Sequence, residues 1–185
     1  MKKSTVILLF GLLLGASAVF KSEHPVFPST RFTNLEGKII PLPDSAKGKY
    51  SIVFTAVNRQ GLDSLMTWVG PAYKTFVNPP QTNSVLVKTD YNVNLYYILA
   101  TKGMPQNISG LLVDTLRRQN DLDLVSKVLL YNEPVQNLSS ALKITDPNNV
   151  YTFLLDYNGK IVYTAPGAYS VKRLNKLTDI LADTK

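Results

Sequence analysis

Apolar residues recur along this 185-residue chain in two periods, which predict β-strands alternating with α-helices. Residues 51–56 form an apolar run without polar alternation, which is typical of a central strand covered on both faces. From about residue 61 to residue 76 the spacing is helical, and one face carries Leu62, Leu65, Met66, Val69 and Tyr73. Pro71 interrupts this helix, so the pattern predicts a kink or an early end there.

The neighbouring segments continue the alternation. Residues 31–33 and 38–41 predict a small hairpin around Glu36-Gly37. Further along, the patterns predict in chain order a strand at 84–89, a short helix at 94–104, a helix from about Pro105, a strand within 123–132 and a short helix at 134–144.

The end of the chain combines a hairpin with a terminal helix. Two strands meet at Asn158-Gly159, a dipeptide that strongly favours a tight hairpin turn. Ser170 is the expected cap of the final helix, whose inward face is predicted to hold Val171, Leu174, Leu177 and Leu181. Strands alternating with helices, closed by a hairpin and a helix, predict an α/β sandwich with a mixed sheet.

The start of the chain has a different pattern. Lys2 and Lys3 precede a short apolar run, and Ala16-Ser17-Ala18 forms a small-residue cleavage signal. Residues 1–18 are therefore interpreted as a secretory signal peptide cleaved after Ala18, and an uncleaved membrane anchor is the alternative. Residues 19–30, with two prolines and the only histidine, are predicted to be a linker or lead-in, and residues 31–185 a single domain. The protein is therefore expected to be exported, to a periplasm or outside the cell.

Composition limits the classes of protein further. The chain has no cysteine, so in an oxidising compartment its fold would depend on the hydrophobic core without disulfide bonds. Its 20 basic and 13 acidic residues give a net charge of +7, but these charges are scattered. Nucleic-acid binding usually needs a dense basic stripe with stacking aromatic residues, so no nucleic-acid partner is expected. Weak contact with an anionic membrane surface stays open.

Three stretches of the sequence resemble the thioredoxin-like superfamily, in its peroxiredoxin-like and copper-chaperone-like branch. "FTNLEGKIIPL" is similar to the segment that opens those proteins, "GKYSIVFTA" to their first core strand, and "VYTFLLDYNGKIVYTAPG" to their closing hairpin. The resemblance covers about residues 32–181 and implies a three-layer sandwich, in which helices cover both faces of a mixed central sheet and a β-hairpin comes first. The same opening and ending also resemble the mitochondrial ATP synthase assembly factors of this fold.

The resemblance also locates what this chain lacks. The reactive Cys-x-x-Cys pair of the superfamily would fall at Arg59 and Leu62, and neither residue can form a thiolate. The cis-proline that those proteins place beside the pair corresponds to Val150 or Tyr151, where a trans peptide bond is expected. The resemblance therefore implies a redox-inactive protein, without disulfide exchange, peroxide reduction or copper–thiolate binding.

No other chemistry replaces the missing thiols. His24 is a lone histidine in a proline-flanked segment, so neither a catalytic nor a metal-binding role is expected. Residues 156–159 are similar to a calcium loop but lack its later acidic ligands, and a hairpin turn explains them. No acid–base pair can be nominated from the isolated carboxylates Asp63, Asp90 and Asp114. The sequence predicts no enzyme, cofactor or metal, and an unrecognised non-thiol active site is the alternative.

Polar and aromatic residues remain around the vacated position, namely Asn58, Arg59, Gln60, Trp68 and Tyr151. Arginine and aromatic side chains are enriched at interface hot spots, so these five are the candidate partner-binding residues. The alternative is that Trp68 belongs to the core and Arg59 is only a solvated helix start. The interpretation is a redox-inactive thioredoxin-like binding protein of the cell envelope, which assists the assembly or stability of another envelope protein or complex. A purely structural envelope component is the further alternative.

Overall fold

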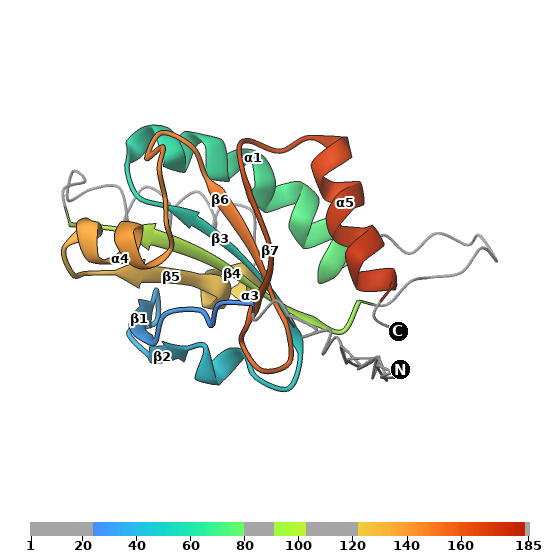
Figure 1. Cartoon of the computed structure of the whole chain (residues 1–185), viewed down its shortest axis with the longest axis horizontal. Coiled ribbons are helices and arrows are strands. Elements are labelled where there is room, and N and C mark those ends of the chain that lie inside the picture. The colour runs from blue at the N-terminus through green and yellow to red at the C-terminus, as the bar shows by residue number, and fades with distance from the viewer. Residues whose placement is uncertain (1–23, 80–90, 103–121, 184–185) are drawn as a thin grey trace, which may run out of the picture.

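Seven strands form one mixed sheet in the computed structural model, which describes residues 24–79, 91–102 and 122–183 (Figure 1). The strands are β1 (Thr30–Asn34), β2 (Ile39–Leu42), β3 (Tyr50–Ala56), β4 (Val93–Ala100), β5 (Val128–Tyr131), β6 (Tyr151–Leu155) and β7 (Ile161–Pro166). Their order across the sheet is β2-β1-β5-β4-β3-β6-β7. The central strands β3, β4 and β5 are parallel, and antiparallel strands flank them on each side.

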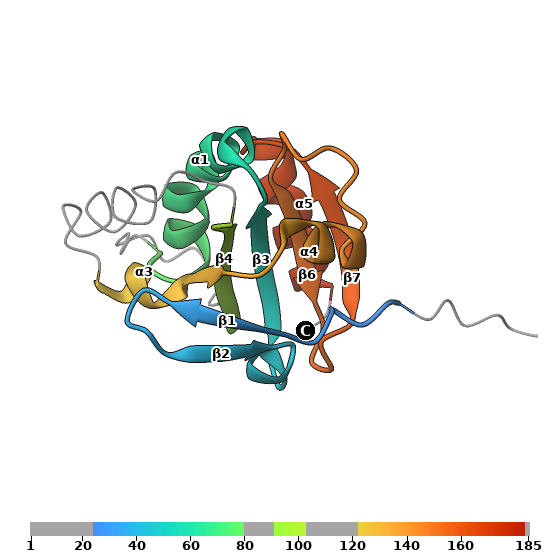
Figure 2. The ribbon, with the colours of Figure 1, turned by 90° about the vertical axis from the view of Figure 1, so that its left-hand side faces the viewer.

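Helices cover both faces of this sheet. They are the 3-10 helix η1 (Asp44–Ala46) and the α-helices α1 (Arg59–Phe76), α3 (Leu122–Lys127), α4 (Val135–Ala141) and α5 (Val171–Ala182). Helices α1 and α5 pack on one face and α4 on the other, as the turned view shows (Figure 2). The expected three-layer α/β sandwich is confirmed, and β1 and β2 form the N-terminal hairpin.

Strand β3 lies at the centre of the packing because its side chains contribute to two cores. Ile52 and Phe54 belong to the core under α1 and α5, whereas Val53 belongs to the core on the α4 side. Phe54 packs against Trp68 and Tyr97, with ring centroids 4.8 Å and 5.5 Å away. Because both faces of β3 are covered, its sequence is an apolar run rather than an alternation.

Strand β4 shows that the prediction of a short helix at residues 94–104 is wrong. Leu95, Tyr97 and Leu99 contribute to the core under α1, whereas Ile98 contributes to the core on the opposite face. This period of two belongs to a strand, and β4 pairs in parallel with β3 on one side and β5 on the other. A short apolar run does not distinguish a doubly covered strand from a buried helix by periodicity alone, which explains the error.

The middle of the chain tests only part of the expected order of elements. The strand at 84–89 and the helix from about Pro105 lie outside the described residues. Strand β5 and helix α4 confirm the strand and the short helix expected at 123–132 and 134–144. Helix α3 is an element that the sequence patterns do not predict.

Helix α1 extends through Pro71, so the early end that this proline predicts does not occur. The buried side of the helix consists of Gly61, Leu62, Leu65, Trp68, Val69, Ala72 and Phe76. A proline inside a helix removes one backbone hydrogen bond and costs about 3 kcal/mol or more. Burial of this long apolar face against the sheet outweighs that cost.

The turn between β6 and β7 is closed by the Asp156 carboxylate. Its Oδ1 accepts hydrogen bonds from the backbone N–H groups of Asn158 (2.8 Å) and Lys160 (2.9 Å). Gly159 has a φ of 78°, and a Cβ there would lie 2.5 Å from the Cβ of Pro43, so glycine is required for both conformation and space. The predicted hairpin is confirmed, and the turn accounts for the four residues that are similar to a calcium loop.

Helix α5 begins as predicted, with the Ser170 hydroxyl accepting a hydrogen bond from the backbone N–H of Arg173 (3.3 Å). Leu177 and Leu181 are buried, as expected for its inward face. Val171 is 62% exposed, so its expected inward position is wrong. As the first residue of the helix it precedes the turns that pack on the sheet.

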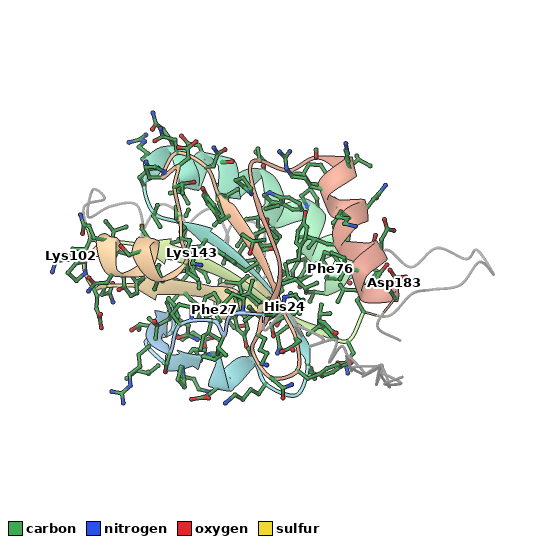
Figure 3. The ribbon with its side chains drawn as sticks, in the orientation of Figure 1. His24, Phe27, Phe76, Lys102, Lys143 and Asp183 are labelled. Carbon is green, nitrogen blue, oxygen red and sulfur yellow. The ribbon has the colours of Figure 1, made fainter. Side chains whose placement is uncertain are left out.

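The described part of the lead-in is integrated into the domain. Phe27 is buried, and its ring lies 6.0 Å from that of Phe153 in an edge-on contact; Figure 3 marks it beside the sheet. The carbonyl of Pro25 accepts a hydrogen bond from the Ile161 N–H (2.8 Å), and Phe27 N–H donates to Gly159 (2.9 Å). The folded domain therefore begins by Pro25 rather than at residue 31. The proposed signal peptide lies outside the described residues. Among the described helices, none is long and apolar enough to cross a membrane.

A closed junction at the carboxyl end of strand β3

The candidate site lies where β3 ends and α1 begins. Asn58 is the N-cap of α1, and its Oδ1 accepts a hydrogen bond from the backbone N–H of Gly61 (2.8 Å). The other end of the same side chain, Nδ2, donates to the Oδ1 of Asn148 (2.8 Å). Asn58 therefore does two things: it caps the helix and ties the helix start to the loop at residues 145–149, which precedes β6.

Helix α1 packs directly on that loop through a glycine. A Cβ at Gly61 would lie 3.0 Å from the carbonyl oxygen of Pro147 and 3.3 Å from that of Asn149, so a side chain there would require the loop to move. The loop is ordered from within by Asp146, which accepts hydrogen bonds from Asn148 N–H (3.0 Å) and Asn149 Nδ2 (2.6 Å). The junction is thus closed by backbone packing and by amide and carboxylate hydrogen bonds.

The peptide bonds before Val150 and Tyr151 are not cis, in agreement with the expectation. Among the residues that the structure describes, the one cis peptide bond is Leu42–Pro43, in the hairpin region instead. The loop before β6 therefore does not have the cis-proline that thioredoxin-like redox proteins place beside their thiols.

Tyr151 is not a surface residue, and its predicted role as a partner contact across from Arg59 is corrected. Its side chain is 5% exposed and belongs to the core on the α4 face of the sheet. Its hydroxyl oxygen accepts hydrogen bonds from the backbone N–H groups of Thr145 (3.2 Å) and Asp146 (3.1 Å), and lies 3.1 Å from the Thr145 hydroxyl. The Tyr151 hydroxyl thus holds the start of the 145–149 loop against the sheet.

The same contacts perturb the ionisation of Tyr151. Burial raises the pKa of its hydroxyl, whereas the hydrogen bonds received from Thr145 and Asp146 lower it, and the net pKa lies below the usual value of 10.0. The lowered value is consistent with N–H donors that point at the phenol oxygen and would stabilise a phenolate.

Trp68 is a core residue, as the alternative interpretation held, so its predicted role as a partner contact is also wrong. It is 1% exposed, and its ring packs edge-on against Tyr169 at 5.4 Å. Its Nε1–H donates to the carbonyl oxygen of Gly167 (3.0 Å), which satisfies the single polar group of the indole. A partner could not reach this side chain without opening the core.

Two of the five predicted residues are fully available to a partner. Arg59 and Gln60 are exposed on the first turn of α1, and Asn58 between them and the loop is half-buried. Arg59 forms no ion pair with a described residue. Sequence reasoning missed Asn148, although the turn-forming run of residues 146–149 marks a loop there.

A shallow hollow lies on the other side of the same loop. It has a volume of about 320 Å³, and its walls come from α4 and from the segment that follows it. The lining residues are Val135, Gln136, Ser139, Ser140, Lys143, Ile144, Thr145 and Pro147. Loop residues 145–149 therefore separate this partly apolar hollow from the polar start of α1.

The junction lacks the reacting atoms of a thiol redox site. The chain has no cysteine, so thiol–disulfide exchange has no reacting atom. In the described ranges no three His, Asp or Glu side chains come together as a metal site. His24 is exposed, and it lies in the lead-in rather than at the junction.

The fold is that of thioredoxin-like thiol:disulfide oxidoreductases. A thiol:disulfide interchange protein of the thioredoxin family from Chlorobium tepidum is similar over 86% of this chain and 97% of its own, with a TM-score of 0.55 and 15% identity. A thiol:disulfide interchange protein from a Bacteroides species is similar over 87% and 91%, with a TM-score of 0.54 and 14% identity. The exposed lipoprotein thioredoxin of Streptococcus pneumoniae is similar over 82% and 99%, with a TM-score of 0.50 and 18% identity.

These similarities show a thioredoxin-like fold, here in a chain without cysteine. No family model matches the sequence, and no curated protein matches it either. Identities of 14–18% establish the fold and not the activity. The narrower resemblance to the ATP synthase assembly factors stays a prediction.

Proposed function

We propose that this protein is a redox-inactive binding protein of the cell envelope, which assists the assembly or stability of another envelope protein or complex. The observation that carries the proposal is the closed junction at the end of β3. The helix start at which the resemblance places the two thiols, at Arg59 and Leu62, is tied to the loop by the Asn58–Asn148 hydrogen bond and by the contact of Gly61 with the loop. What the junction offers outward is Arg59, Gln60 and loop amides, which suit protein recognition.

Export is part of the same proposal. The lysine pair, apolar run and Ala16-Ser17-Ala18 predict a cleaved signal peptide, and one protein of similar fold is an exposed lipoprotein. N-terminal sequencing of the protein from its native host should therefore begin at Val19. A mature chain that retains Met1 would instead favour the anchor.

The binding test uses the two exposed residues, because Tyr151 is buried. Arg59→Ala with Gln60→Ala should weaken capture of the envelope partner by about 1–3 kcal/mol, or about 5- to 150-fold. The matched control is Lys74→Ala with Asn78→Ala, which removes one exposed cation in the last turn of the same helix and one exposed amide just beyond its end. Both variants should melt near the wild-type temperature, since each change is on the surface.

The readout is recovery of partners from a native envelope extract, followed by affinity measurement with the recovered protein. If the junction variant, the control variant and wild type recover every protein equally, the binding surface is elsewhere. Redox inactivity is tested separately: the pure protein should show no catalytic reduction of insulin, and its melting temperature should not change with a thiol reductant. Turnover in that assay would contradict the proposal, since no residue here supplies a thiol.

A further inference from the structure

Strand β7 forms one outer edge of the sheet, and most of that edge has no neighbour among the described residues. The strand order ends with β7, which Figure 2 shows at the right-hand margin with α5 behind it. In the described part of the chain, the lead-in covers this edge only at its start: Val26 forms an isolated antiparallel bridge with Lys160, just before β7, and the Pro25 carbonyl accepts a hydrogen bond from the Ile161 N–H. Beyond Ile161, no described residue pairs with the outer side of the strand.

The hydrogen-bond pattern identifies which groups point outward. Gly167 N–H donates to the Val150 carbonyl (2.8 Å), so residue 167 faces β6. In an antiparallel ladder alternate residues face the neighbour, so Ala165 also faces β6 and Thr164 faces outward. Thr164 is exposed, and no described residue pairs with its outward N–H and C=O groups. Such a pair is the template to which an extended segment can add as a strand.

A basic hollow lies directly beside this edge. It has a volume of about 750 Å³, between Tyr163 of β7 and the outer side of α5. Of its lining residues, Lys172, Arg173 and Lys176 are cationic, and only Asp179 is anionic.

The charges of the hollow are largely available to a ligand. Lys172 and Lys176 are exposed and form no ion pair with a described residue. Arg173 is partly engaged, since its Nη1 donates to Ala168 and to Ser170. The N-terminus of α5 opens onto the same hollow and adds to its positive potential.

We propose that the open edge of β7 and the basic hollow beside it accept an extended acidic segment of a partner protein as an additional strand. Its backbone would pair with Thr164, and its carboxylates would face Lys172 and Lys176. This inference concerns a different surface from the closed junction and does not depend on it.

A second copy of this chain is the less favourable occupant of the edge. Pairing β7 with β7 would bring the lysines of the two α5 helices close together, and like charges across such an interface are repulsive. Pro166 has no N–H to donate and ends the edge soon after Thr164, which is a common device against self-pairing. An acidic segment avoids the charge repulsion, and Pro166 limits its backbone pairing to the part of β7 before residue 166.

The test uses the full chain and a labelled peptide of about eight alternating Glu and Val residues, a length that spans the open edge. Fluorescence anisotropy should detect saturable binding that weakens as salt is added. Lys172→Glu with Lys176→Glu should weaken binding at least about tenfold, because two attractive contacts become repulsive. The matched control, Lys38→Glu with Lys74→Glu, changes net charge equally at exposed sites elsewhere and should bind like wild type.

A second measurement locates the peptide on the edge. In the isotope-labelled protein the backbone amide of Thr164 should shift on binding and exchange more slowly with solvent, while the amide of Ile40 on the opposite edge strand should not change. No binding by wild type, equal loss in both charge variants, or shifts centred away from β7 would overturn the proposal. So would dimerisation through β7 without peptide, since it would identify a second copy as the occupant.

Discussion

The Tyr151 hydroxyl provides the sharpest test of how the closed junction is held. Tyr151→Phe removes one oxygen and leaves the ring in the core, stacked 6.3 Å from Phe153. The oxygen receives backbone hydrogen bonds from Thr145 (3.2 Å) and Asp146 (3.1 Å), which hold the start of the loop on the sheet. The loop in turn holds the Asn58 amide through Asn148, so the effect should extend to the start of α1.

The expected cost follows from these bonds. Each neutral hydrogen bond contributes about 0.5–1.5 kcal/mol net, and an N–H left unpaired in a buried site costs about 1–3 kcal/mol. Thr145 and Asp146 are exposed residues, so water can reach their N–H groups after a small movement of the loop. The full burial penalty is therefore not incurred, and Tyr151→Phe should lower the free energy of unfolding by about 1–2 kcal/mol.

The measurement is urea denaturation with a matched control. Tyr157→Phe removes a hydroxyl from a ring that is 52% exposed, and its stability should stay within about 0.5 kcal/mol of wild type. If Tyr151→Phe is as stable as Tyr157→Phe, the hydroxyl does not hold the loop. If Tyr151→Phe instead weakens partner capture at unchanged stability, Tyr151 contacts the partner despite its burial.

Three further perturbations test other parts of the same structure. Asn58→Ala removes both the helix cap and the tie to the loop and should lower the free energy of unfolding by about 1–2 kcal/mol, whereas Asn58→Asp keeps the cap acceptor and should lose less in urea denaturation. Thr55→Val should leave the free energy of unfolding unchanged or raise it by about 1 kcal/mol, because the buried Thr55 hydroxyl has no hydrogen-bond partner in the described structure. Ser51→Ala on the same strand removes a hydroxyl that donates to the Ala46 carbonyl and should lower the free energy of unfolding. Urea denaturation that finds Thr55→Val less stable than Ser51→Ala would contradict this reasoning. Burial, the charge of the nearby Glu133 and a hydrogen bond to it all raise the pKa of the Tyr131 hydroxyl above 10.0. The contribution of Tyr131 to the free energy of unfolding is therefore complete below the pKa of the unfolded state and is lost as pH rises through the pKa of the folded state. The free energy of unfolding of Tyr131→Phe should therefore fall less than that of wild type as pH is raised into the alkaline range. An equal fall in the two proteins would refute the raised pKa of Tyr131.

Elements whose signals are local could be predicted from the sequence. The turn at Asn158-Gly159, the cap at Ser170 and the run that forms β3 each depend on residues close together in the chain, and all three are present. The helix predicted at residues 94–104 is wrong because the signal there is not local. Whether an apolar run is a strand depends on which elements cover it, and β4 is covered by parts of the chain far from it in sequence.

The strand–helix junction was predictable in position but not in detail, and its role in binding a partner stays a prediction. The end of β3 and the start of α1 were placed correctly, and Arg59 and Gln60 are exposed there. The sequence could not show that Trp68 and Tyr151 are buried on opposite faces of the sheet, because that depends on tertiary packing. Nor could it show the Asn58–Asn148 hydrogen bond, whose partners are 90 residues apart.

The closed junction also determines what kind of recognition is possible at the end of β3. In a thioredoxin-like redox site, N–H groups at a helix N-terminus help to stabilise a thiolate. Here the Gly61 N–H is already satisfied by Asn58, whose other amide group is bound to Asn148. Because Asn58 already accepts from the Gly61 N–H, capture of an anion by that N–H would require breaking the cap, at a cost of about 0.5–2 kcal/mol. A partner therefore gains more from the exposed Arg59 and Gln60 side chains than from the backbone beneath them, which is why the binding test changes those two residues and leaves Asn58 intact.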